Sequence, residues 1–589
     1  MHWRPPPQRC PGFRAARPAA AGLWLVLLFP ALAPAAQGAA PPVATGTDIG
    51  AGSAADPGPT GTELPSGVPP LQTPGLPTDA ELEKAHAVIG KILIDNQNIF
   101  DLSNPKDDQP LFRLADRLHA RTKPGTIRAQ LLFKTGDRYD RRVLDETERI
   151  LRAESYFYDA WIRPIAYHDG KVDIRVTTKD VWTLNPGFNY SRAGGTNTTG
   201  EQLEEINTLG TGTDLRILHE TNIDRTELLF SASNQHAFDT WTQVALTYGD
   251  LSDGHLHDYT IAYPFYALDS RWAASSNGND DLETDSLYDR GNIIDQFSDQ
   301  HNYVQVYGGW SPGLQNGWVQ RWQTGVTYIE DRFAPVSTWT GITTLPENRE
   351  FVYPWIQYTL IQDDYARLYN HDQILRTEDF YLGTTATVQV GYAPEAFGST
   401  RDALMFQSAW GKGFRNGGST LLLSGDFSGR LEGTQLDNGL ADVYARYYVI
   451  QSKNWLFFST FVGSKGWRLD LDNQLLLGGD NGLRGYPLRF QDGTGRMLFS
   501  AEQRYFTDWF PFRLFRVGAA VFTDIGRTWG EPELAQPSLG LLKDVGFGLR
   551  FGNARSGLGN VIHVDLAFPL NATAGIPKVQ FVVQTEQTF

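Results

Sequence analysis

The feature that most constrains this chain is an alternation of apolar and polar residues that recurs from residue 184 to the end. Val545, Phe547 and Leu549 share one face of a segment whose other face is Gly546 and Gly548. A period of two residues indicates half-buried β-strands, and no helical pattern interrupts the series. We therefore expect a mainly β architecture over residues 184–589.

Composition excludes several classes of protein. With 51 Lys+Arg against 67 Asp+Glu the formal net charge is −16, whereas a nucleic-acid binder needs a basic surface. The mean hydropathy is −0.34, and after the N-terminus the sequence has no apolar run of about 18 residues. This excludes a membrane protein of several helices. It does not exclude a transmembrane β-barrel, whose strands average out as polar.

Residues 1–40 have the three-part layout of a secretory signal peptide. Four arginines precede an apolar core over residues 19–32, and small residues follow it. We expect cleavage near Gly38–Ala40. The single cysteine, Cys10, lies in this segment, so the mature chain is expected to have no disulfide, thiolate–metal site or cysteine nucleophile.

Two further segments precede the alternating region. Residues 41–78 contain nine prolines and are predicted to form a disordered linker. Residues 79–183 are predicted to form a small α+β domain with the order strand, helix, helix, strand, strand. Its expected parts are a strand at 88–94, a helix at 126–133, a helix capped by Asp140, and a hairpin that turns at 168–170.

The alternating strands fit either a soluble sandwich or a membrane barrel. The signal peptide, the absence of thiols and the aromatic residues near strand ends favour the barrel, and open sheet edges do not survive in lipid. At roughly 25 residues per strand and connection, residues 184–589 predict a transmembrane antiparallel β-barrel of about 16 strands. Residues 275–300 are expected to form a long polar outer loop. The terminal Phe589 is predicted to be the C-terminal assembly signal.

One glycine-rich segment stands out between two expected strands, at about 465–477 and 497–506. Residues 478–487 read Gly-Gly-Asp-Asn-Gly-Leu-Arg-Gly-Tyr-Pro. An ordinary glycine-rich turn is one interpretation. The strands that follow bring two carboxylates, Glu502 and Asp524, to their polar faces.

These residues resemble a known family. Leu483-Arg484-Gly485-Tyr486 is similar to the Val-Arg-Gly-Phe/Tyr loop motif of the BamA/TamA-like outer-membrane assembly superfamily, with Leu in place of the usual Val. The segment 521–526 is similar to its strand motif that ends Asp-x-Gly, and residues 79–183 look like one POTRA domain. This single domain departs from the family pattern, because BamA has five such domains and TamA has three.

The resemblance implies a luminal loop, Gly482, Leu483, Arg484, Gly485 and Tyr486, in which Arg484 pairs with Asp524 and Glu502 on the barrel wall. Arginine stays charged and offers a planar fork to two carboxylates. An ion pair that only fills the barrel predicts the same contact without a role in activity. The family also uses the seam between first and last strands, here about 187–191 and 579–589.

The resemblance further implies a non-enzymatic protein in the bacterial outer membrane, with the POTRA-like domain in the periplasm, that assists insertion, assembly or translocation of proteins. Expected partners are outer-membrane lipid, unfolded protein clients that add to a free edge of the POTRA hairpin, and the barrel-assembly machinery for the chain's own insertion. No nucleic acid partner is expected. The alternatives are a two-partner secretion transporter for one substrate and a passive channel or structural barrel.

We find no catalytic motif and expect no cofactor. The 11 histidines lack the spacing of a metal-protease helix, and no nucleotide-binding loop is present. The acidic residues between Asn279 and Asp289 lack the ligand spacing of a calcium loop, so we interpret them as a solvated outer loop and predict no metal site.

Overall fold

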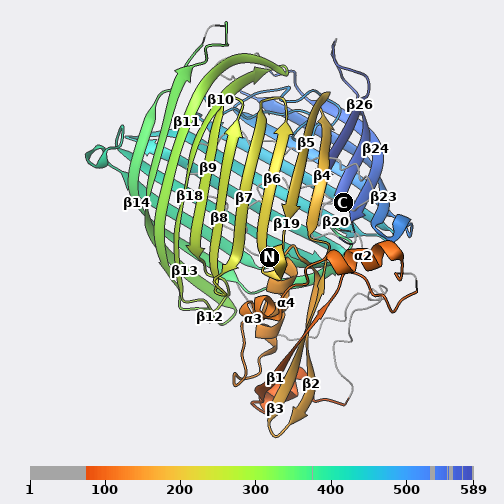
Figure 1. Ribbon diagram of the computed structural model, residues 1–589. Helices are drawn as coiled ribbons and strands as arrows, with labels where there is room; N and C mark the ends of the chain where they lie inside the picture. The colour runs from red at the N-terminus through yellow and green to blue at the C-terminus, as the bar shows by residue number, and fades with distance from the viewer. Residues whose placement is uncertain are drawn as a thin grey trace.

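The structure is a computed structural model, and it describes residues 75–105, 107–341, 343–373, 376–530, 538–553, 555, 561–573 and 575–586. A large β-barrel lies above a small α+β domain formed by the N-terminal part of the chain (Figure 1). The predicted signal peptide, almost all of the predicted linker and Phe589 lie outside the described residues. Within those residues, no helix is long and apolar enough to cross a membrane.

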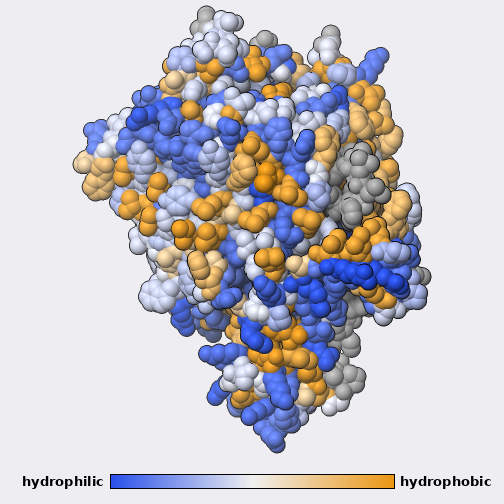
Figure 2. Space-filling model, viewed as in Figure 1, coloured by the Kyte–Doolittle hydropathy of each residue, from blue (hydrophilic) through white to orange (hydrophobic). Residues whose placement is uncertain are grey.

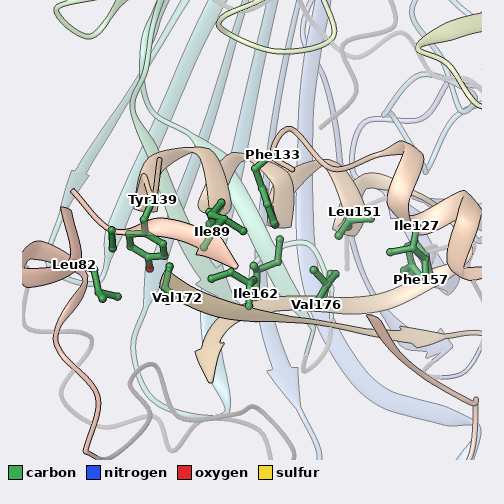
Figure 3. Close-up of a cluster of buried hydrophobic side chains, with 14 of the residues drawn as sticks. Leu82, Ile89, Ile127, Phe133, Tyr139, Leu151, Phe157, Ile162, Val172 and Val176 are labelled. Carbon is green, nitrogen blue, oxygen red and sulfur yellow. The ribbon is translucent and has the colours of Figure 1, made fainter. Parts of the chain in front are cut away.

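The N-terminal domain contains a three-stranded sheet in the order β1-β3-β2, with β1 parallel to β3. Its apolar core joins the sheet to α1, α3 and α4 (Figure 3). The elements are α1 (Asp79–Lys84), β1 (Val88–Gln97), α2 (Pro110–Leu118), α3 (Pro124–Ala129), α4 (Arg141–Ala153), β2 (Phe157–His168) and β3 (Lys171–Asp180).

Local signals explain most of this domain. The Asp140 side chain accepts hydrogen bonds from the backbone N–H groups of Arg142 and Val143 and so caps α4, as expected. Asp169 and Gly170 both have positive φ, which suits the tight turn of the β2–β3 hairpin. The expected order of strand, helix, helix, strand and strand is present, but α1 and α2 are additional helices, and α3 is shorter than its predicted range.

In the described part of the chain the barrel closes through 20 long antiparallel strands, not about 16. A two-residue strand, β12 (Leu314–Gln315), extends one hairpin. The long strands are β4 (Leu184–Ala193), β5 (Thr196–Glu205), β6 (Thr213–Thr221), β7 (Thr226–Ala237), β8 (Thr242–Leu251), β9 (Gly254–Tyr263), β10 (Trp272–Asp289), β11 (Asn292–Trp310), β13 (Trp318–Pro335), β14 (Arg349–Gln362), β17 (Thr384–Ala393), β18 (Ala403–Asn416), β19 (Ser419–Glu432), β20 (Gln435–Ile450), β21 (Trp455–Trp467), β22 (Gly495–Phe506), β23 (Phe515–Trp529), β24 (Leu542–Asn553), β25 (Val561–Pro569) and β26 (Gln580–Glu586).

The sequence predicted too few strands because polar residues were assigned to loops. Residues 275–300, expected as an outer loop, belong to β10 and β11, which pair continuously from Trp272↔Trp310 to Asp289↔Asn292. Cross-strand hydrogen bonding does not require apolar side chains, so a polar segment can extend a hairpin beyond the apolar band. The strand expected at 465–477 instead ends at Trp467, and a long connection begins there.

The alternation separates two faces of the wall. Val521 and Phe547 are 57% and 52% exposed, whereas Asp524 and Arg550 on the same two strands are fully buried. Apolar side chains therefore face outward and polar side chains face the barrel interior, which is the arrangement of a lipid-facing barrel rather than a soluble sandwich. Hydrophobic and hydrophilic residues are both visible on the outer wall in Figure 2.

Candidate functional site in the barrel lumen

The glycine-rich segment lies in the connection from β21 to β22 and packs against the inner wall. Gly479 donates a backbone hydrogen bond to the Pro487 carbonyl, and Leu483 donates one to the Gly478 carbonyl, so the segment forms a compact turn. Gly482 has a φ of 115°, a conformation that residues with a Cβ rarely adopt. A Cβ on Gly485 would lie 2.7 Å from the Cβ of Asp544. Both glycines therefore allow the loop to approach the wall closely.

Arg484 contacts three acidic side chains from three strands. Its Nε and Nη2 donate to the two carboxylate oxygens of Asp524 at 2.8 and 2.9 Å, which is a bidentate pair. Nη1 donates to Glu502 Oε1 at 2.7 Å and to Asp565 Oδ2 at 3.2 Å. The guanidinium carbon lies 3.4 Å from the centroid of the Phe522 ring. The structure thus places Arg484 against both carboxylates named from the sequence and adds Asp565 of β25.

Two further arginines complete this network. Arg504 Nε donates to Glu502 Oε2 at 2.9 Å, and Arg550 donates to Asp565 and to Glu502. Arg504 and Arg550 are almost wholly buried. Buried charges are tolerated when they are paired and hydrogen-bonded, and removal of one partner from such a pair costs about 3–5 kcal/mol. Each arginine and each carboxylate in the network is therefore paired, and together these pairs hold the loop to the wall.

Leu483 and Tyr486 fix the loop beside Arg484. Both are fully buried and pack in one apolar cluster with Leu477, Phe490 and Leu542. The hydroxyl oxygen of Tyr486 lies 3.0 Å from the Lys543 carbonyl oxygen and 2.6 Å from Asn571 Oδ1. The apolar pair and the arginine therefore attach the same turn to β22–β25.

The other end of the loop binds a different part of the barrel. Arg489 donates to both carboxylate oxygens of Asp224 at 2.7 and 2.6 Å, in the turn between β6 and β7. Its guanidinium lies 4.3 Å from the centroid of the Tyr288 ring on β10. A Cβ on Gly194, in the β4–β5 turn, would lie 2.2 Å from the Leu488 backbone nitrogen. The sequence alone does not predict these contacts, because nothing in the local pattern links Arg489 to Asp224.

The seam of the barrel lies between these two anchors. β26 closes the barrel against β4, and among the described residues their register contains one pair, Val583↔Arg192. The neighbouring pairings contain seven pairs for β25–β26 and ten for β4–β5. Fewer paired residues mean fewer inter-strand hydrogen bonds, so the seam is the least paired junction between described strands.

A second inserted element packs against the barrel wall at the end nearest the N-terminal domain. The hairpin of β15 (Tyr365–Tyr369) and β16 (Thr377–Tyr381) lies between β14 and β17 in the chain but forms its own two-stranded sheet. Its Leu368 and Phe380 pack with Leu382, which follows β16, and with the wall residues Tyr448, Leu456, Phe458, Phe506 and Val561. Tyr448 donates to Asp372 Oδ1 at 2.7 Å. The hairpin is therefore a plug, residues 363–383, attached to the wall.

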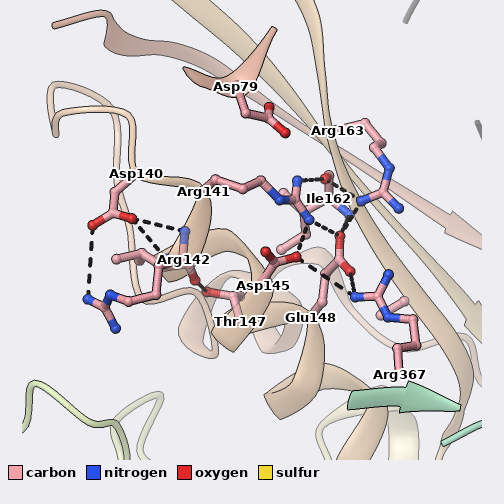
Figure 4. A network of polar contacts seen from close by, with 12 residues as sticks. Asp79, Asp140, Arg141, Arg142, Asp145, Thr147, Glu148, Ile162, Arg163 and Arg367 are labelled. Carbon is pink, nitrogen blue, oxygen red and sulfur yellow. Dashed lines mark hydrogen bonds and ion pairs between the residues drawn. The ribbon is translucent and has the colours of Figure 1, made fainter. Parts of the chain in front are cut away.

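The same hairpin binds the N-terminal domain through a buried carboxylate. Glu148 of α4 accepts hydrogen bonds from Arg141, Arg152, Arg163 and Arg367, the last of which belongs to β15 (Figure 4). Burial alone raises the pKa of Glu148, but the guanidinium groups outweigh it and lower the pKa to about 2. Arg152 also donates to both oxygens of Asp379 at 2.6 and 2.8 Å. Charge pairing therefore attaches the domain to the plug.

The edge strand β2 is not free in the way expected for client binding. Arg152 donates to the Ala160 carbonyl and Arg141 to the Ile162 carbonyl, while Ile162 N–H donates to Glu148. The opposite edge strand, β1, is covered near its start by Asp137 and Tyr139. Its later part carries Leu93, which is half exposed. Side chains of α4 therefore occupy the backbone groups of β2 at Ala160 and Ile162, whereas in the described part of the chain no such contact is made to β1 between Ile92 and Asp95.

Comparisons with known proteins were made by sequence and by structure. No family model matches the sequence, and no curated protein matches it. Among solved structures, the chain is similar to BamA and CdiB. BamA from Haemophilus ducreyi lacking POTRA domains 1–3 matches with a TM-score of 0.38 and 12% identity, and the match covers 84% of each chain.

CdiB from Escherichia coli matches with a TM-score of 0.43 and 13% identity, over 85% of this chain and 77% of that one. CdiB from Acinetobacter baumannii matches with a TM-score of 0.39 and 12% identity, over 85% of this chain and 73% of that one. Similarity at this level assigns no function, so the proposal below depends on the geometry of the loop, the seam and the plug.

Proposed function

We propose that this chain is a non-enzymatic β-barrel of the bacterial outer membrane that assists the insertion, assembly or translocation of proteins. Its small N-terminal domain would act as a POTRA-like module in the periplasm. The observation that carries the proposal is the loop that is anchored by Arg484 to β22–β25 and by Arg489 to the β6–β7 turn, on the two sides of the least paired junction in the described barrel.

The loop would control how readily the seam separates. While both anchors hold, the first and last strands are connected from inside the lumen. Release of one anchor leaves β4 and β26 joined by their sparse pairing alone. A separated edge of β4 or β26 offers backbone groups to a client strand, and strand addition of this kind depends little on client sequence.

The N-terminal domain would receive clients before they reach the seam. The part of β1 from Ile92 to Gln97 is the edge whose backbone is not covered by residues 135–139. An extended segment can add to such an edge through backbone hydrogen bonds. The same domain contacts the plug through Glu148 and Arg367, so client binding on the domain would be coupled to the plug through this contact.

Two other functions are testable rivals. A two-partner secretion transporter would export a single cognate substrate. A passive channel would need an open path, which the packing of Leu368 and Phe380 among wall residues disfavours. An enzyme is not proposed, because the buried Arg–carboxylate network has the pairing expected of a structural clasp.

The test is quantitative proteomics of the outer membrane and of secreted protein after depletion of this chain, with rescue by wild type or by Arg484→Ala. A loss of several barrel proteins that wild type restores and Arg484→Ala does not would support the proposal. Loss of a single secreted protein would favour the transporter instead. An unchanged proteome would overturn the assembly function.

The matched control is Arg468→Ala. Arg468 lies in the same connection and pairs with Asp437 at 2.7 Å, but its side chain is 63% exposed. Exposed ion pairs contribute about 0–1 kcal/mol, so this variant should restore function as wild type does. If neither variant restored function, the β21–β22 connection would be sensitive to any substitution. A specific role of Arg484 would then be refuted.

A further inference from the structure

Two histidines and an aspartate form a compact group on the outer wall of the barrel. His255 and His257 are two residues apart on β9, so both side chains point to the same face. Asp280 of β10 is the register partner of His257. Ile261 lies an even number of residues from both histidines and so shares their face of β9. It is half exposed, so this face points outward. The group lies near the β8–β9 turn, at the end of the barrel away from the N-terminal domain.

The spacing of the group is that of metal ligands. His255 Nε2 and His257 Nδ1 lie 3.4 and 3.7 Å from Asp280 Oδ2, and the three atoms are within 4.8 Å of one another. Zn–N and Zn–O bonds of about 2.0–2.1 Å in a tetrahedral site place neighbouring ligand atoms about 3.4 Å apart. Asp280 Oδ1 has no hydrogen-bond partner among the described residues.

Neighbouring residues orient the two rings. The His255 and His257 rings are stacked with centroids 4.8 Å apart, and the His257 ring stacks on Tyr248 at 5.1 Å. Asp250 of β8 is the register partner of His255, which places a carboxylate-bearing residue beside His255. Metal-binding imidazoles commonly have such a carboxylate near their second nitrogen.

We infer that His255, His257 and Asp280 bind a divalent transition-metal ion of the Zn²⁺ type. Imidazole suits Zn²⁺, Cu²⁺ and Ni²⁺ better than Ca²⁺ or Mg²⁺. Three protein ligands leave a fourth position for water or for an external anionic ligand. The expectation of no metal site rested on helical histidine spacings and on the ligand spacing of a calcium loop. A His-x-His pair on one strand with an aspartate on the next strand fits neither pattern.

The metal site is tested on the purified full chain in detergent, titrated with Zn²⁺ alone in a calorimeter. Wild type should bind one equivalent and gain thermal stability, since an ion that binds only the folded state stabilises it. His255→Gln combined with His257→Gln should weaken binding at least tenfold, as should Asp280→Asn. His168→Gln, in the exposed β2–β3 turn, is the control and should bind as wild type. Equal binding by all variants, or none by wild type, overturns the site.

A separate observation concerns α2, which presents an apolar face to the exterior. Leu111, Leu114 and Leu118 follow an i, i+3, i+7 spacing and are 42%, 42% and 63% exposed. Arg113 points away from the leucine face, at about 130° around the helix from its centre, whereas Arg117 borders that face beside Leu114. Figure 2 shows an apolar strip directly above a hydrophilic strip where Figure 1 places α2, at the lower rim of the barrel.

The barrel holds α2 in place at this rim. Phe112 and Ala115 bury against Trp182 and Leu514, the last of which lies in the β22–β23 connection. Asp107, just before the helix, accepts a hydrogen bond of 2.6 Å from Arg513. The helix is therefore fixed to the periplasmic ends of strands near the seam, with its leucine face left open.

The same connection exposes two aromatic side chains. Trp509 is 62% and Phe512 is 82% exposed. Phe512 and Arg513 have φ values of 52° and 55°, so two consecutive residues with a Cβ adopt a left-handed conformation that costs free energy. This turn holds the Phe512 ring outward rather than burying it. Aromatic residues are enriched at membrane interfaces, where one side is apolar and the other wet.

We propose that α2, Trp509 and Phe512 contact the periplasmic leaflet of the bilayer, with the leucines toward the acyl chains. The inference rests on the proposed membrane location of the barrel, whose outward face on β23 carries the exposed Val521. Arg113, which points away from the leucines, suits the aqueous side and anionic headgroups. Contact here would place a lipid-embedded helix beside the seam.

Single-cysteine variants in a Cys10→Ser background test this contact. Leu114→Cys, Phe512→Cys, Arg113→Cys and Val521→Cys carry an environment-sensitive fluorophore in vesicles of phosphatidylethanolamine and phosphatidylglycerol. Probes at 114, 512 and 521 should show apolar emission and resist aqueous quencher, and the probe at 113 should not. Apolar emission at 521 with aqueous emission at 114 and 512 would overturn the helix contact. Aqueous emission at 521 as well would instead overturn the membrane location in the proposed function.

Discussion

Arg484 and Arg489 lie five residues apart in one loop, yet they bind carboxylates on the two sides of the barrel seam. Arg484 holds Asp524 of β23, and Arg489 holds Asp224 in the β6–β7 turn. Between these partners lie β4 and β26, whose described register is a single pair. The loop thus connects the first and last parts of the barrel from within, and both of its anchors use bidentate arginine–carboxylate pairs.

Arg484→Ala should destabilise the barrel by about 3–5 kcal/mol, because Asp524, Glu502 and Asp565 would keep their charges without their shared partner. We expect a lower midpoint in denaturant unfolding of the purified protein. Arg484→Lys should recover part of the loss, since an ammonium group keeps the charge but not the fork. Arg468→Ala should change the midpoint by less than about 1 kcal/mol. An unchanged midpoint for Arg484→Ala would show that the network does not hold the loop.

The sequence predicted the Arg484 site because its signals are local. Strand alternation assigned Glu502 and Asp524 to the polar face, and the motif assigned the loop. The contact of Arg489 with Asp224 joins positions 265 residues apart, and no periodicity encodes such a distance. The additional strands were missed because the polar residues of β10 and β11 look like loop residues. The helix α2 was missed because its leucines remain exposed and its buried Phe112 and Ala115 pack in a separate cluster with Phe100, Trp182 and Leu514, not in the main core of the domain.

A disulfide across the seam should block function if the seam opens. Arg192→Cys and Val583→Cys face each other in the paired register, and the only native cysteine lies at position 10. Oxidation should abolish rescue in the depletion assay, and a reductant should restore it. The control pair, Ala567→Cys with Gln580→Cys, joins β25 to β26 within the continuous wall and should have no effect. Full activity of the oxidised seam variant would exclude opening at this junction.

Removal of the plug should open a path for ions. Deletion of residues 365–381 removes β15 and β16 and with them Leu368 and Phe380. We expect a conductance in planar bilayers at least several-fold above that of wild type. The milder change Asp379→Asn breaks the pair with Arg152 and should give intermittent openings. A wild-type conductance as large as that of the deletion would support the passive channel.

The attachment of the N-terminal domain should resist acid because of Glu148. The folded pKa of Glu148 is about 2, below its ordinary value of about 4.5, so its contribution is fully present above pH 4.5 and is lost as the pH falls toward 2. Denaturant midpoints measured from pH 7 to pH 2 should therefore fall mainly below pH 4.5. Glu148→Gln should lower the midpoint at pH 7 and flatten this dependence. Asp95→Asn, at an exposed position of β1, is the control; the same flattening there would refute the role of Glu148.

A client that adds to the N-terminal domain should contact β1 rather than β2. A photo-crosslinking residue at Leu93 lies on the accessible part of β1, whereas the Ala160 and Ile162 carbonyls of β2 are bound by Arg152 and Arg141. Illumination in cells should crosslink unfolded clients to position 93 and not to position 168, the exposed turn used as control. Arg141→Ala combined with Arg152→Ala should uncover β2 and add crosslinks at a probe placed at position 158. Crosslinks to β2 in the wild-type background, with none at position 93, would show that clients displace the α4 side chains and would refute the β1 edge as the docking strand.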